Sequence, residues 1–179
     1  MRKKVVIVSS SPRKNGNSDI LAEEFARGAR DAGHTVRKID VRELELKFCT
    51  GCFYCQNYDG CALKDGMNAL YGDVQNADAL VFATPVYYYA VCGQLKTFLD
   101  RLNPLYGRNN RFKKVYLLAT SAEDDRAAMD GSIKDVQGWI DCFDGVTLAG
   151  VVYGTGANEK GEIKNTPAPA EAYAMGKNL

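Results

Sequence analysis

The chain alternates between short apolar runs and longer stretches in which apolar residues recur at helical spacing. Lys4–Ser9 is a continuous run of mainly β-branched residues, which is typical of a strand buried on both faces. Residues 17–33 carry an apolar stripe at helical spacing and end in Gly33, so they predict an amphipathic helix with a glycine cap. The same pattern predicts further strands at residues 35–41, 79–84, 114–120 and 146–153, and further helices at residues 66–75, 93–102, 124–143 and 169–177.

Strands that alternate with helices indicate a parallel sheet covered by helices on both faces. Right-handed crossovers leave few topologies for five such strands, and we expect a doubly wound, flavodoxin-like α/β fold with strand order 2-1-3-4-5. No internal repeat, linker or low-complexity segment interrupts the pattern. We therefore predict a single domain over residues 1–179, with a cysteine-rich loop at residues 48–65 inserted after the second strand.

Composition narrows the class of protein. Hydrophobic residues make up 46% and charged residues 25%, the balance of an ordinary soluble globular protein. The formal net charge of +1 supplies no field that would attract nucleic acid or an anionic membrane, so we expect neither as a partner. The longest apolar stretch, residues 77–91, is broken by Asp78 and Pro85, and the apolar run at the N-terminus is too short for a signal peptide. We therefore predict a cytoplasmic protein, whose thiols stay reduced.

Four of the six cysteines lie close together in the spacing C-x2-C-x2-C-x5-C: Cys49, Cys52, Cys55 and Cys61. A C-x2-C-x2-C run often delivers thiolates to a four-iron (4Fe-4S) cluster, and this is our first interpretation. Three alternatives stay open: a thiol cluster without metal, a structural zinc site, and a thiol–disulfide redox pair. The other two cysteines, Cys92 and Cys142, are expected to be small buried hydrophobic residues.

The loop at residues 9–18 joins the first strand to the first helix. It is rich in hydroxyl groups, carries Arg13, and places backbone N–H groups at a helix N-terminus, which is a ready site for an anion. Neither G-x4-G-K-[ST] nor G-x-G-x-x-G occurs in it, so we expect a phosphate monoester rather than a nucleoside triphosphate or a dinucleotide. The alternative is a polar turn in which Asn17 or Ser18 merely caps the helix.

Two further loops follow strands whose carboxyl ends should meet the first loop at one edge of the sheet. Residues 84–89 end in three consecutive tyrosines, whose rings can flank a flat ring system or simply pack. Residues 119–123 include several small residues, which let the backbone approach a planar ligand, although Ser121 can instead cap the following helix.

These segments together resemble a known family. The sequence S-S-P-R at residues 10–13, with G-N-S at 16–18, resembles the G-S-P-R-x-x-G-N-T phosphate loop of NAD(P)H-dependent FMN reductases. The sequence T-P-V-Y at 84–87 and the segment 95–101 resemble that family's T-P-V-Y…L-K-x-F-x-D-R. The cysteine spacing, and K-D-G-M at 64–67, resemble its iron–sulfur flavoprotein subgroup.

The resemblance implies a set of binding residues. The FMN phosphate would be held by Ser11, Arg13, Asn17 and Ser18, with Ser9 as a further candidate. The isoalloxazine would be lined by Pro85, Val86, Tyr87 and Tyr88, and its far edge by Thr120, Ser121 and Ala122. This sequence departs from the family at Ser10 and Ala122, where relatives carry glycine.

The function that follows is that of an FMN-dependent oxidoreductase, taking electrons from NAD(P)H or a ferredoxin-like donor and passing them to a small-molecule or protein acceptor. The flavin carries the chemistry, so no catalytic side chain is expected. The alternatives are a cluster-free NAD(P)H:quinone or flavin reductase and a non-enzymatic electron carrier. The resemblance also implies a homodimer or homotetramer, in which the cysteine loop reaches a neighbour's flavin.

Overall fold

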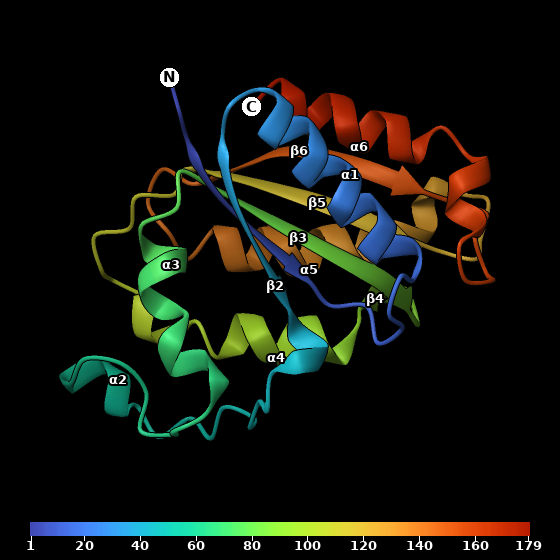
Figure 1. Cartoon of the computed structure of the whole chain (residues 1–179). Helices are drawn as coiled ribbons and strands as arrows, with labels where there is room; N and C mark the ends of the chain where they lie inside the picture. The colour runs from blue at the N-terminus through green and yellow to red at the C-terminus, as the bar shows by residue number, and fades with distance from the viewer.

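The computed structural model describes residues 1–179 and contains one parallel sheet between two layers of helices (Figure 1). Its strands are β1 (Lys4–Ser9), β2 (Thr35–Asp40), β3 (Ala79–Tyr87), β4 (Ala90–Val91), β5 (Lys114–Thr120) and β6 (Thr147–Gly154). The five long strands are all parallel and lie in the order β2-β1-β3-β5-β6. This confirms the flavodoxin-like order, since β5 and β6 are the fourth and fifth predicted strands. The prediction missed β4, which pairs antiparallel with the end of β3.

The helices are α1 (Asn17–Asp31), α2 (Tyr54–Asn57), α3 (Tyr71–Gln75), α4 (Gly93–Asp100), α5 (Asp130–Ile140) and α6 (Ala168–Lys177). The predicted helix at residues 66–75 is in fact a 3₁₀ turn, Gly66–Ala69, followed by α3. The predicted helix at 124–143 is shorter, because a 3₁₀ turn at Arg126–Met129 precedes α5. None of the helices is long and apolar enough to cross a membrane.

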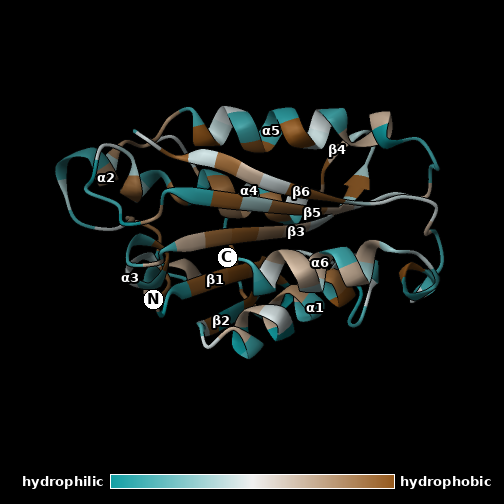
Figure 2. Cartoon of the chain, turned by 90° about the horizontal axis from the view of Figure 1, so that it is seen from above, coloured by the Kyte–Doolittle hydropathy of each residue, from teal (hydrophilic) through white to brown (hydrophobic).

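Helices cover both faces of the sheet (Figure 2), which explains the continuous apolar run of β1. Val6 and Val8 belong to the core on the side of α3, α4 and α5, whereas Val5 and Ile7 belong to the core under α1 and α6. Helices α1 and α6 pack with their backbones in close approach. A Cβ at Gly28 would lie 2.1 Å from the carbonyl oxygen of Tyr173, so glycine is required there.

Helix α4 separates two ends of the molecule. The carboxyl ends of β1, β3 and β5 meet at one edge, together with β4 and the first residue of α4, Gly93 (right side of Figure 1). The chain after β2 instead runs along α4, past Val41–Glu43, and reaches the cysteine loop and α2 at the opposite end (lower left of Figure 1). Eight residues of helix rise about 12 Å, so the two regions are well separated within one chain.

Candidate functional site

The first turn of α1 leaves several hydrogen-bond donors without a partner in the protein. Gly16 is the N-cap residue and supplies no side chain to the turn. The backbone N–H groups of Asn17, Ser18 and Asp19 have no acceptor, and the buried Ser18 Oγ has no hydrogen-bond partner. Unpaired donors at a helix N-terminus are the set that a phosphate or carboxylate takes. The loop after β1 therefore fits an anion.

The predicted phosphate residues play different parts in this loop. Ser11 Oγ donates to the carbonyl oxygen of Arg13 at 2.9 Å and so shapes the turn. The exposed Arg13 guanidinium lies 3.3 and 3.4 Å from the carbonyl oxygen of Asn158. A Cβ at Gly16 would lie 2.4 Å from Ser11 Oγ and 2.9 Å from the Arg13 carbonyl oxygen. The turn is thus closed around a position that only glycine fits.

The Asn17 side chain points away from the phosphate loop. Its Nδ2 donates to the carbonyl oxygens of Ala157 and Glu159 at 2.9 and 3.0 Å, and its Oδ1 accepts from the N–H of Gly161 at 2.9 Å. These three bonds hold the segment that follows β6 against the start of α1. Asn17 therefore offers an anion its backbone N–H, while its amide is used to join two distant parts of the chain.

Ser9 is also engaged, with a residue that the sequence analysis missed. Ser9 Oγ donates to Asp19 Oδ1 at 2.8 Å, and the same oxygen lies 2.5 Å from Lys38 Nζ, on β2. Burial opposes ionisation of Asp19, but the hydrogen bonds from Lys38 and Ser9 outweigh it and lower the pKa of this carboxyl. An acidic residue in the first turn was a visible signal, yet acids are common there because of the helix dipole. Nothing local connects Asp19 with Lys38.

The β3–β4 hairpin places the tyrosines at the same edge of the sheet. Tyr88 and Tyr89 form its two-residue turn, with φ of 49° and 62°. Such turns normally take Asn-Gly, and each bulky residue in the left-handed region costs about 1–2 kcal/mol. The turn is held by α5, because a Cβ at Gly131 would lie 1.9 Å from the Tyr89 carbonyl oxygen and Asp135 accepts from the Val91 N–H at 3.1 Å. The Tyr88 side chain is fully exposed. Strained backbone of this kind is typical of ligand sites.

Short contacts join the three loops. Ser10 donates through both N–H and Oγ to the carbonyl oxygen of Ala83, at 2.9 and 2.8 Å, and its Oγ lies 3.2 Å from Cys92 Sγ. Cys92 is buried, as predicted. Pro85 and Thr120 are register partners in adjacent strands, so the two predicted linings of the isoalloxazine are neighbours.

The third loop has a buried and an exposed part. Ser121 is buried. Its N–H donates to the carbonyl oxygen of Gly154 at 3.0 Å, and its carbonyl oxygen accepts from the N–H of Ala157 at 2.9 Å. Ala122 is exposed. Val86 is half-buried and Tyr87 exposed at the end of β3. The structure thus gathers every residue predicted for FMN at one edge of the sheet.

The four loop cysteines line one narrow cavity of about 20 Å³, together with Asp100 and Arg101 at the end of α4 and Asn103 in the 3₁₀ turn that follows. Cys49 and Cys52 are exposed, whereas Cys55 and Cys61 are half-buried. Asn103 Nδ2 lies 3.1 Å from Cys55 Sγ. No group of three or more His, Cys, Asp or Glu side chains is close enough to hold a single metal ion. The cavity has room for about one water molecule, so a larger group requires the loop to widen.

A buried ion pair holds both ends of this loop. The Arg101 guanidinium, only 1% exposed, bonds the two carboxylate oxygens of Asp65 at 2.6 and 2.9 Å and the carbonyl oxygen of Lys47 at 2.7 Å. The N–H of Lys47 donates to Asp65 at 3.0 Å. Burial alone would raise the pKa of Asp65, but Arg101 and the backbone N–H groups lower it to about 2. Residues 47 and 65 flank the cysteines, so Arg101 fixes where the loop begins and ends.

Two donors beside this ion pair have no partner: Arg101 Nε and the Tyr71 hydroxyl, both buried. Burial and the neighbouring Cys61 raise the pKa of Tyr71, so its hydroxyl keeps its proton. Arg101 lines the cysteine cavity, and although Asp65 balances its charge, its buried Nε–H has no acceptor. An unpaired N–H beside a thiolate-bound group can donate a hydrogen bond to it.

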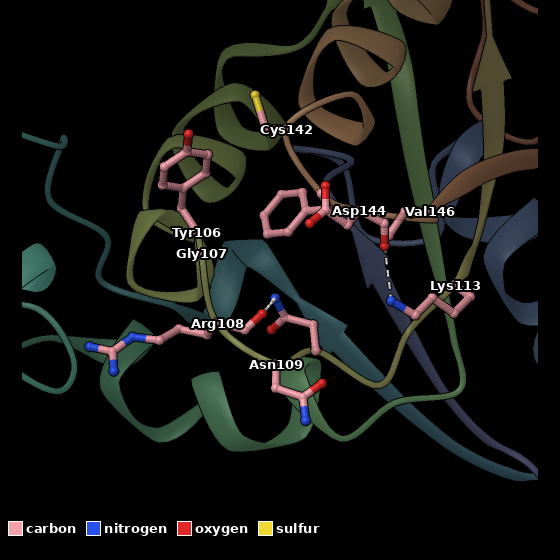
Figure 3. Close-up of a pocket in the computed structure, with 10 residues that line it drawn as sticks. Tyr106, Gly107, Arg108, Asn109, Lys113, Cys142, Asp144 and Val146 are labelled. Atoms are coloured by element: carbon pink, nitrogen blue, oxygen red, sulfur yellow. Dashed lines mark hydrogen bonds between the residues drawn. The ribbon is translucent and has the colours of Figure 1, made fainter.

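A separate cavity of about 410 Å³ lies at the amino ends of β5 and β6 (Figure 3). Lys113 Nζ donates to the Asp144 carbonyl oxygen on its wall at 2.9 Å. Cys142, at the end of α5, lines this cavity and is exposed, so the expectation that it is buried was wrong. Helix α5 ends at Ile140, and Cys142 lies in the turn that follows it rather than on the helix face packed against the sheet. None of the predicted binding residues lies here.

Comparison with known proteins agrees with this arrangement of loops on a flavodoxin-like sheet. The model of the NADPH-dependent FMN reductase family matches residues 3–158, and the chain therefore belongs to that family. An iron–sulfur flavoprotein from Archaeoglobus fulgidus is 35% identical over 113 residues, which cover 63% of this chain and 51% of that protein. The chain thus spans about half the length of this relative.

Two longer matches extend the likeness. An iron–sulfur flavoprotein from Methanosarcina thermophila is 27% identical over 138 residues, covering 76% of this chain and 72% of that protein. The solved structure of an NAD(P)H:quinone oxidoreductase from Methanothermobacter marburgensis aligns with a TM-score of 0.79 at 20% identity, over 100% of this chain and 98% of that one. That last likeness shows the shared fold.

Proposed function

We propose that this protein is an FMN-dependent oxidoreductase that takes electrons from NAD(P)H or a ferredoxin-like donor and delivers them to a small-molecule or protein acceptor. The observation that carries the proposal is the set of unpaired donors in the first turn of α1, above all the buried Ser18 Oγ. A phosphate monoester satisfies such a set. Membership of the NADPH-dependent FMN reductase family supports FMN as the molecule that brings the phosphate.

In this proposal FMN, when bound, supplies the hydride and single-electron chemistry. The protein binds and orients it. Arg13 and the α1 donors hold the phosphate, and Ser9, Ser11 and Asn17 keep their loop in shape. The ring system lies against the ends of β3 and β5, where Pro85, Val86, Tyr87, Tyr88, Thr120, Ser121 and Ala122 form the predicted lining. No side chain at this edge is required as an acid or base.

We further propose that Cys49, Cys52, Cys55 and Cys61 bind a 4Fe-4S cluster. Two observations support it: the four thiols line one cavity, and the buried Arg101 beside them keeps a free Nε–H suited to a negatively charged group. The archaeal relatives are named iron–sulfur flavoproteins, which also supports a cluster. The cluster would require the loop to open, since the cavity is only about 20 Å³.

The narrowness of that cavity favours a second candidate, a cluster-free NAD(P)H:quinone or flavin reductase in which the cysteines hold no metal. If a cluster is present, the length of α4 separates it from the flavin site of the same chain. Transfer would then use a neighbour's flavin in a homodimer or homotetramer. That assembly, and the cytoplasmic location, stay predictions.

The test is anaerobic purification followed by an absorption spectrum and analysis of flavin, iron and acid-labile sulfide. We expect stoichiometric FMN, and iron and sulfide in equal amounts. Flavin without iron would leave the cluster-free reductase. Steady-state oxidation of NADH or NADPH by the purified protein distinguishes an enzyme from an electron carrier. A colourless protein that does not bind added FMN would contradict the proposal.

A further inference from the structure

A buried carboxylate lies where the proposed function requires an anion to bind. Asp19 is 3% exposed and belongs to the first turn of α1. Its Oδ1 accepts from Ser9 Oγ, and its Oδ2 accepts from the N–H of Asn15 at 3.0 Å. Asn15 has a φ of 54°, so the carboxylate stabilises a left-handed residue in the middle of the phosphate loop. Asp19 therefore shapes the loop but also brings a negative charge to it.

A single lysine neutralises that charge. Lys38 Nζ, from β2, lies 2.5 Å from Asp19 Oδ1 and 2.6 Å from Glu23 Oε1. The Lys38 side chain is 18% exposed and that of Glu23 55%, so Lys38 and Asp19 form the buried half of the cluster. The neighbouring Asp40 carboxylate is already paired with Arg42.

The arrangement matters because the phosphate would bind at the same turn. The backbone N–H of Asp19 is one of the unpaired donors, so a phosphate held there lies within one helical turn of the carboxylate. Two negative charges at that separation repel strongly in a partly buried site. With Lys38 in place, the carboxylate keeps its role in shaping the loop while its charge is offset by a lysine that it shares with the more exposed Glu23.

We propose that Asp19 and Lys38 are positioning residues through which this loop selects a phosphorylated flavin over riboflavin. Asp19 holds the loop in the shape that exposes its N–H groups, and Lys38 removes the repulsion that Asp19 would otherwise exert on the phosphate. The inference rests on the proposed FMN site, and it assigns the pair a role that differs from general support of the fold. Riboflavin, which has no phosphate, should be indifferent to the charge on this pair.

The experiment measures dissociation constants for FMN and riboflavin by quenching of flavin fluorescence at neutral pH. In Lys38→Met we expect the preference for FMN over riboflavin to fall by about tenfold or more, since an uncompensated carboxylate faces the phosphate. In Asp19→Asn the amide can keep both loop contacts, with its oxygen accepting from the Asn15 N–H and its nitrogen donating to Ser9 Oγ. The preference should rise, because the negative charge beside the phosphate is removed while Lys38 stays in place, paired with Glu23. The double variant should return close to the wild-type preference. Lys96→Met, which breaks an exposed ion pair with Asp100 on α4, is the matched control and should change neither constant.

The outcomes separate the two proposals. An equal loss of affinity for FMN and riboflavin in Lys38→Met would show a merely structural role and overturn the inference. A fall in the preference for FMN over riboflavin in Asp19→Asn would overturn it as well. If the Lys38→Met protein does not fold, the flavin preference of Asp19→Asn alone tests the inference. A wild-type protein that binds riboflavin as tightly as FMN would overturn the phosphate site and this inference with it. A wild-type preference that no variant alters would overturn only the inference.

Discussion

The regions at the two ends of α4, the carboxyl edge of the sheet and the cysteine loop, are held together by different kinds of contact. At the carboxyl edge of the sheet, the loops continue from buried parallel strands, and main-chain bonds such as Ser10 to Ala83 fix their relative positions. At the other end, the cysteine loop has only the one-turn helix α2 and is tied by the ion pair of Arg101 and Asp65. The first region is preorganised by the fold itself, whereas the second depends mainly on one buried ion pair.

The largest effect is expected from Arg101→Met. The substitution leaves the Asp65 carboxylate buried without its partner, which costs about 3–5 kcal/mol. The change is measured as the free energy of unfolding in urea. Lys96→Met on the same helix breaks an exposed ion pair and should cost about 0.5 kcal/mol or less. Similar losses of stability in the two variants would contradict the view that the cysteine loop depends on the buried ion pair of Arg101 and Asp65.

At the opposite edge, Arg13→Ala should leave the fold intact and weaken FMN binding. Loss of a charge-assisted hydrogen bond to phosphate costs about 1.5–3 kcal/mol. Isothermal titration with FMN measures the effect. Lys14→Ala, which removes the neighbouring charge, is the control, and its affinity should stay close to wild type. Unchanged affinity in Arg13→Ala would remove this residue from the phosphate site.

Acid should weaken the ion pair between Asp65 and Arg101 before it disturbs the sheet. The pKa of Asp65 is about 2 in the folded protein and about 3.9 in an unfolded chain. A lowered carboxyl pKa contributes stability that is fully present above the unfolded value and is lost as the pH falls from about 4 to about 2. The free energy of unfolding should decline over this window. The decline should be shallower in Arg101→Met, and an identical slope would show that the pair does not cause it.

The smallest effect is expected from Tyr71→Phe. The buried hydroxyl has no partner, so its removal relieves a desolvation penalty and should leave stability unchanged or raise it by about 1 kcal/mol. Thermal or urea unfolding of the metal-free protein measures the change. A clear loss of stability would mean that the hydroxyl has a partner in the folded protein.

The comparison also shows which predictions the sequence supported. The order of helices and strands, and the edge at which three loops meet, follow from hydrophobic periodicity, which is local to each segment. The motif at residues 10–13 and the spacing of the cysteines were equally readable. The boundaries of α5, the short strand β4 and the exposure of Cys142 were not, because each depends on what packs against it.

The sequence by itself determined the fold class, the loop that we propose binds phosphate, and the group of four thiols, since each depends on residues that are close together in the chain. Only the tertiary structure decided that the cysteine loop lies at the far end of α4, and that Asp65 and Arg101 close it from positions 36 residues apart. It also decided that Asp19 is neutralised by Lys38. Burial and charge pairing arise between segments distant along the chain, and no local pattern encodes which of them will meet.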